Sequence, residues 1–141
     1  MITQTSCTIF GLNLLKGLEN FTSTSPYVYK IALYNANANL GNTTIDYTSV
    51  NEVTGTGYTA GGQVLTPVSL GSDNTNNTAF VSFSNVTWSP ASFTTRGALI
   101  YNSTTGAAVF VLNFGSDKIP TSTFTVTFPT ADSTNAIIRI T

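Results

Sequence analysis

The segment TTRGALIYNSTTGAAVFVLNFG (residues 94–115) contains two strand-like runs separated by a short polar sequence. Residues 94–102 and 107–115 are rich in apolar and β-branched side chains, and Ser-Thr-Thr-Gly between them is typical of a hairpin connection. The second run is apolar on both faces, which suits a central strand or a strand covered by a partner. We therefore expect an antiparallel hairpin in a β-rich fold.

Similar runs continue on both sides of this hairpin. Apolar residues follow a strand-like pattern in five further segments: 27–34, 63–70, 78–88, 123–128 and 136–141. Stretches rich in Gly, Asn, Ser and Thr predict loops at 35–44, 55–62 and 71–78. Residues 45–53 fit either a short strand or an extended loop, and Pro67 is typical of an edge strand. Seven or eight short strands predict a mainly β domain, an antiparallel β-sandwich or barrel-like fold.

One helix is predicted near the N-terminus, at about residues 6–20. The spacing of three, four and four residues along one apolar stripe indicates a helix, and Leu15 widens it; the stripe consists of Cys7, Phe10, Leu14 and Leu18. Thr5 or Ser6 is a suitable cap. Cys7 is expected to be a small core residue. With this helix and the sandwich, residues 1–141 are predicted to form a single domain.

Charge is the unusual feature of the composition. Asp, Glu, Lys and Arg make up 8% of the 141 residues, where about 25% is usual. The chain has 26 Thr and 14 Asn, and its formal net charge is −1. A surface of hydroxyl and amide groups gives little electrostatic protection against association. The composition therefore favours a chain that functions within an assembly.

Several function classes are excluded by residue types. The chain has no histidine and one cysteine, so histidine-based triads, imidazole metal sites, an internal disulfide and a thiolate zinc site are ruled out. Its five scattered cations do not form the basic cluster that nucleic-acid binding requires. No apolar run approaches the roughly 20 residues of a membrane span. We expect no enzyme activity, no cofactor, no metal and no signal peptide.

The remaining candidates are acids, aromatic residues and one arginine. The six acids are widely spaced and are expected to be solvated or singly paired. Four aromatic residues are predicted as interface anchors: Tyr27, Tyr34, Tyr58 and Trp88. Arg96 is predicted to be a partly buried structural tie, hydrogen-bonded to a carboxylate or to backbone carbonyls. Arg96→Ala is then expected to cost a few kcal/mol of stability. Gly97 is predicted to be a bulge or a point of close contact.

Five blocks of the sequence, in one order, resemble small structural proteins of tailed bacteriophages and prophages. The blocks are YKIALYNANANL, TSVNEVTGTGYTAGGQVL, WSPASFTTRGALIYN, AAVFVLNFGSDK and FPTADSTNAIIRI. The resemblance extends over nearly the whole chain, including the short N-terminal helix with its cysteine. It implies a virion component without catalytic residues, and it does not indicate a position on the particle.

Three functions remain open at this point. We expect a capsid decoration or cement protein that binds the major capsid protein or other virion proteins, stabilises the assembled head and forms a trimer or other closed ring. It would be made in the cytoplasm of a bacterial host and reside in the virion. The first alternative is a structural subunit of the tail, neck or fibre base. The second is a carbohydrate-binding module, with Tyr58 and Trp88 as its sugar platform.

Overall fold

The computed structural model describes residues 1–141 and contains one helix and ten strands. The N-terminal elements are β1 (Thr5–Ser6), α1 (Thr8–Lys16) and β2 (Tyr29–Tyr34). The central elements are β3 (Gln63–Leu65), β4 (Pro67–Asp73), β5 (Thr78–Phe83) and β6 (Val86–Trp88). The C-terminal elements are β7 (Thr95–Asn102), β8 (Ala108–Lys118), β9 (Phe124–Val126) and β10 (Ile138–Ile140).

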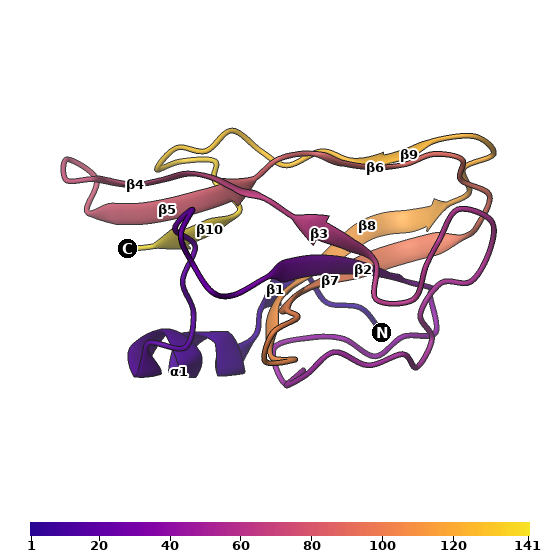
Figure 1. The fold of residues 1–141 in the computed structure, drawn as a ribbon, viewed down its shortest axis with the longest axis horizontal. Coiled ribbons are helices and arrows are strands. Elements are labelled where there is room, and N and C mark those ends of the chain that lie inside the picture. The colour runs from indigo at the N-terminus through magenta and orange to yellow at the C-terminus, as the bar shows by residue number, and fades with distance from the viewer.

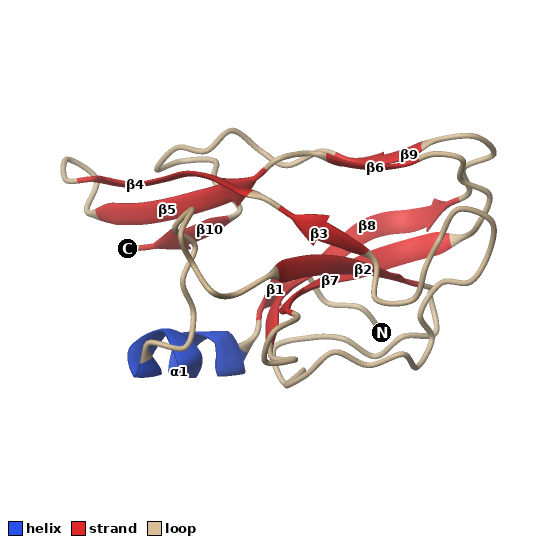
Figure 2. Cartoon of the chain, in the orientation of Figure 1, coloured by secondary structure: helices blue, strands red, loops and turns tan.

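The strands form two layers, as Figures 1 and 2 show. One layer is a five-stranded sheet in the order β1-β8-β7-β2-β3. The other contains a three-stranded sheet in the order β10-β5-β4 and the pair β6-β9. Every pairing between these strands is antiparallel. The predicted mainly β, antiparallel packed architecture with one short N-terminal helix is therefore confirmed.

The hairpin predicted at residues 94–115 is formed by β7 and β8, which lie in the interior of the five-stranded sheet. The register shifts between Thr95 and Gly97, so this part of the hairpin is bulged. A Cβ atom at Gly97 would lie 2.5 Å from the carbonyl oxygen of Leu112 and 3.0 Å from the side chain of Ile2. Gly97 is thus both a bulge and a point of close contact, as predicted.

Both faces of β2 are buried, and Lys30 is its one charged residue and the one that is only partly buried. Ile31 and Leu33 belong to the larger hydrophobic cluster, which also contains residues of the opposite layer. Ala32 and Tyr34 belong to a second cluster, with Leu40 from the long connection between β2 and β3. This connection, residues 35–62, therefore contributes to the hydrophobic cover of one face of the sheet, and 45–53 is an extended loop within it.

The helix is shorter than predicted at both ends, because strand β1 precedes it and Gly17 ends it. Cys7, and not Thr5 or Ser6 as predicted, is the N-cap residue, and it makes no side-chain capping bond. Gly17 ends the helix in the left-handed region, at φ 72°, which glycine adopts without strain. Leu15 is 88% exposed and Leu18 is also exposed, so the prediction that they belong to the buried stripe was wrong. Cys7 is buried, and burial raises the pKa of its thiol to about 11.

The region 63–78 also differs from the prediction. The predicted strand at 63–70 is divided into β3 and β4, and β4 continues to Asp73 into the predicted loop. Residues 74–77 then form a tight turn to β5. Strand β4 lies at the edge of its sheet and begins at Pro67. The edge position predicted from this proline is confirmed.

Candidate protein interaction site

Two of the four predicted interface anchors lie inside the protein. Trp88 is 2% exposed and Tyr34 is completely buried. The hydroxyl group of Tyr34 donates a hydrogen bond to the backbone oxygen of Thr48 over 2.6 Å. Neither side chain can contact a partner in this fold, so the prediction for these two residues is corrected. Burial in the two hydrophobic clusters is the physical reason.

Tyr58 and Tyr27 are partly buried and pack against the larger cluster. The Tyr58 hydroxyl points to polar groups within the protein: it donates to Oε1 of Glu52 over 2.6 Å and accepts from the backbone N–H of Leu33 over 2.9 Å. Its ring lies 6.3 Å from that of Trp88 in a stacked arrangement within the core. These two rings therefore do not form the exposed sugar platform that the carbohydrate-binding alternative requires.

The acid of this network, Glu52, was expected to be solvated or singly paired, and it is neither. The side chain is buried and accepts three hydrogen bonds: from the hydroxyl groups of Tyr47 and Tyr58, each over 2.6 Å, and from the backbone N–H of Gly61 over 2.7 Å. Burial, followed by the bond to Glu52, raises the pKa of both tyrosines. Glu52 thus joins parts of the long loop to one another and, through Tyr58, to β2.

A second buried carboxylate lies after the helix. Oε2 of Glu19 accepts from the hydroxyl group of Tyr29 over 2.7 Å and from Nδ2 of Asn102 over 3.3 Å. Its Oε1 is buried without a hydrogen-bond partner. Burial raises the pKa of Glu19 above its usual value. The two buried acids belong to separate hydrogen-bond networks, and neither was identified from sequence, because each follows or precedes polar residues that indicate a loop.

Arg96 is paired with a carboxylate, as predicted, but on the surface. Its Nε lies 2.8 Å from Oδ1 of Asp117, and the two side chains are 35% and 43% exposed. An ion pair with this exposure contributes about 0–1 kcal/mol. The predicted loss of a few kcal/mol in Arg96→Ala is therefore too large.

No group of three or more His, Cys, Asp or Glu residues in the structure could hold a metal ion.

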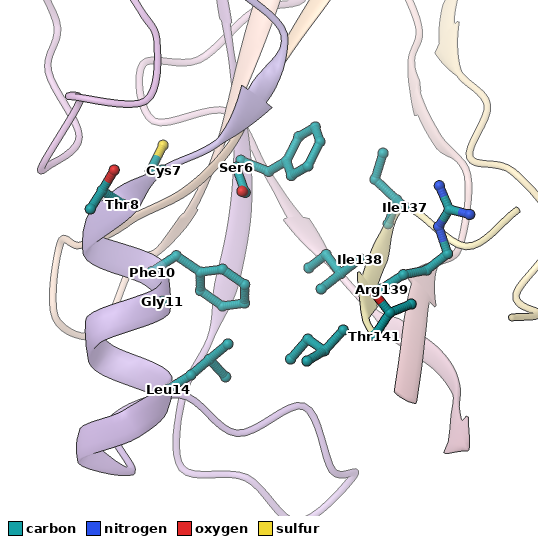
Figure 3. Close-up of a pocket in the computed structure, with 12 residues that line it drawn as sticks. Ser6, Cys7, Thr8, Phe10, Gly11, Leu14, Ile137, Ile138, Arg139 and Thr141 are labelled. Atoms are coloured by element: carbon teal, nitrogen blue, oxygen red, sulfur yellow. The ribbon is translucent and has the colours of Figure 1, made fainter. Parts of the chain in front are cut away.

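The largest cleft lies between helix α1 and strand β10, with a volume of about 750 Å³. In Figure 3, Phe10 and Leu14 extend from the helix toward Ile138, which extends from the strand on the opposite side. Phe110 of β8 and Ser6 of β1 also line the cleft. A partly apolar surface of this kind, between two elements far apart in the sequence, is suited to binding another polypeptide.

A smaller apolar cavity of about 120 Å³ adjoins the cleft and shares four of its residues. All nine residues that line it are hydrophobic: Phe10, Leu14, Phe21, Leu70, Ala79, Phe80, Val81, Ile138 and Ile140. Ile140 is 53% exposed, and Leu70 is also more than half exposed. The cleft and the cavity together form a continuous surface, mixed in the cleft and apolar in the cavity, which we call the α1–β10 groove.

Strand β10 supplies one wall of the α1–β10 groove and is an edge strand. It pairs with β5 on one side only, and β1 is likewise the edge of the five-stranded sheet. The only charged side chain that lines the cleft is that of Arg139, which donates to the backbone oxygen of Thr134. The cleft therefore has a mixed polar and apolar lining with little charge, the adjoining cavity is apolar, and both border the open backbone edge of a strand.

Comparison of the chain with protein-family models, with characterised proteins and with solved structures finds no match. None of its helices has the length and apolar character needed to span a membrane. The site is accordingly interpreted from its own geometry and chemistry.

Proposed function

We propose that this protein is a structural component of a bacteriophage virion, and that it decorates the assembled head as a cement protein. The observation that carries the proposal is the α1–β10 groove, a partly apolar surface beside an open strand edge. An open strand edge presents backbone N–H and C=O groups to which a strand of another protein can add. The resemblance to small structural proteins of tailed phages is the reason for choosing a phage particle as the assembly.

The near absence of charge supports the same function. With a formal net charge of −1 and charged residues at 8% of the chain, neighbouring copies experience little electrostatic repulsion. A protein that binds only the assembled shell stabilises that state by mass action. Many weakly bound copies then reinforce the shell without any catalytic step.

A subunit of the tail, neck or fibre base remains the second candidate, because the same groove could join subunits of a ring. The carbohydrate-binding module is not favoured, since Trp88 is buried and the hydroxyl group of Tyr58 is bonded to Glu52. A neutral, hydroxyl-rich surface alone does not select a sugar ligand.

The test is a count of copies in purified particles. Antibodies against the recombinant chain, calibrated with known amounts of it, measure its ratio to the major capsid protein. A head decoration protein is expected at on the order of hundreds of copies, whereas a closed ring in the tail or neck contains about a dozen or fewer. Absence of the chain from particles would overturn the virion proposal. A count of about a dozen or fewer copies would place the protein in the tail or neck instead of on the head.

A further inference from the structure

The cleft lies between two sheet edges that have no partner strand. Strand β10 ends one sheet and β1 ends the other, and residues of both line the cleft. The edge of a sheet presents backbone N–H and C=O groups that can pair with an added strand. Because Phe10, Leu14 and Ile138 extend toward one another here (Figure 3), an added strand would also find apolar contacts for its side chains.

The opposite edge of the three-stranded sheet, β4, carries features that oppose strand addition. Strand β4 begins at Pro67, and its register with β5 shifts between Val68 and Gly71. Proline and bulges of this kind prevent edge-to-edge pairing. Strand β10 has neither feature, and its only charged residue, Arg139, is held by the backbone oxygen of Thr134. The β10 edge is therefore open in a way that the β4 edge is not.

The apolar area of the groove is too small for a face-to-face dimer. Complete burial of a Leu or Ile side chain contributes about 1.5–3 kcal/mol at about 25 cal/mol/Å², which corresponds to roughly 60–120 Å². Ile140 and Leu70 are each about half exposed, so together with partly buried Leu14 they offer on the order of 100–200 Å². A standard interface buries about 800 Å² on each partner. An added strand does not need such an area, because its backbone supplies much of the affinity.

Residues 1–141 contain no unpaired strand that a second copy could donate without unfolding. Every strand is paired in a sheet, and the first residues are fixed as well: the N-terminal ammonium group donates to the backbone oxygen of Ala38, and Ile2 forms a bridge with Leu40. We therefore take a segment of another polypeptide as the occupant; pairing of β10 with the β10 edge of a second copy is the alternative, and a dimer in solution would reveal it.

We propose that the α1–β10 groove binds an extended arm of another polypeptide, which adds to the β10 edge as a further strand. Alternate apolar side chains of the arm contact Phe10, Leu14 and Ile140, while the side chains between them face solvent. This inference rests on the proposed function in one respect only: under that function, the arm belongs to another virion protein. The binding chemistry is independent of that source.

The experiment uses the intact 141-residue protein and capped synthetic peptides that alternate Thr with Val, Ile or Phe, with Lys at both ends for solubility. Amide chemical shifts of the labelled protein are recorded during titration. We expect a dissociation constant below about 1 mM for at least one peptide, with shift changes concentrated at residues 5–14 and 137–141. Peptides that differ from these only by a central proline are expected not to bind, because proline removes a backbone donor.

Two matched variants identify the groove. Ile140→Asp places a charge in the groove, whereas Ile119→Asp places one at a similarly exposed isoleucine, 68% accessible, that does not line it. We expect Ile140→Asp to weaken binding at least about tenfold and Ile119→Asp to leave it unchanged. Binding of none of the peptides, equal loss in both variants, or shift changes away from β10 would overturn the proposal. A negative peptide result with the chain abundant in particles would refute the strand site and leave the virion function standing.

Discussion

Replacement of Glu52 by alanine should be among the most damaging single changes away from the hydrophobic core. The variant removes the acceptor of three hydrogen bonds, from the hydroxyl groups of Tyr47 and Tyr58 and from the backbone N–H of Gly61. A buried donor left without a partner costs about 1–3 kcal/mol. Part of this loss is offset because a buried polar side chain no longer has to be desolvated. We expect a decrease of about 3–4 kcal/mol in the free energy of unfolding.

The glutamine variant is the matched comparison, because it keeps the size of the side chain. Its Oε1 can accept from Tyr58 and Gly61, and its amide group can donate to the oxygen of Tyr47 after the hydroxyl group rotates. We therefore expect Glu52→Gln to lose about 1 kcal/mol. The difference between the two variants measures the hydrogen bonds rather than the shape of the side chain.

Urea unfolding followed by tryptophan fluorescence measures both losses, since Trp88 is the one tryptophan and is buried. For a domain of this size a loss of 3–4 kcal/mol corresponds to a decrease of about 10 °C in melting temperature. Hydrogen exchange should increase first in residues 45–62 of the alanine variant. If alanine and glutamine caused equal losses, or if alanine cost less than about 1 kcal/mol, the reasoning that Glu52 fixes this loop would be refuted.

Three further changes have expected outcomes. Gly97→Ala should cost about 1–3 kcal/mol in urea unfolding, because its Cβ would lie 2.5 Å from the carbonyl oxygen of Leu112; unchanged stability would contradict this contact. Arg96→Ala should lower stability by at most about 1 kcal/mol, since its pair with Asp117 is exposed, and a loss of several kcal/mol would contradict that. Burial raises the folded-state pKa of Glu19 above 4.5, so between pH 4.5 and that raised pKa the folded protein binds more protons than the unfolded chain. The free energy of unfolding therefore falls as pH rises through this range. Glu19→Gln should remove this dependence, and an unchanged slope of unfolding free energy against pH would contradict it.

The strands could be predicted because their signal is local. In β2 and in residues 123–128 the side chains alternate between two faces, and the burial of Val126 and Phe128 follows this alternation. The hairpin of β7 and β8 has the same kind of signal on both sides of a short turn. Element ends were less predictable: β1 formed where a helix start was expected, because residues 5 and 6 pair with β8, a contact more than a hundred residues away.

The α1–β10 groove had no local signal. Its walls come from residues 6–14, 21, 70, 79–81, 110 and 137–141, so it exists only after the chain has folded. The burial of Glu52 likewise has no local signal in the sequence and arises only when the chain folds. The residues that satisfy its carboxylate lie in a loop of polar and glycine residues, which in sequence is typical of a solvated surface.

Tyr34, Tyr58 and Trp88 do not present the exposed ring predicted for an anchor, and for the tyrosines the reason applies to most of the chain. Five of the six tyrosine hydroxyl groups donate to an acceptor inside the protein. The acceptors are Glu19 for Tyr29, the Thr48 carbonyl for Tyr34, Glu52 for Tyr47 and Tyr58, and the Gly61 carbonyl for Tyr101. The large side chains left exposed are aliphatic, such as Leu15 and Ile140. In a chain of this composition, mutagenesis that searches for a binding surface should therefore target exposed leucine and isoleucine rather than tyrosine and tryptophan.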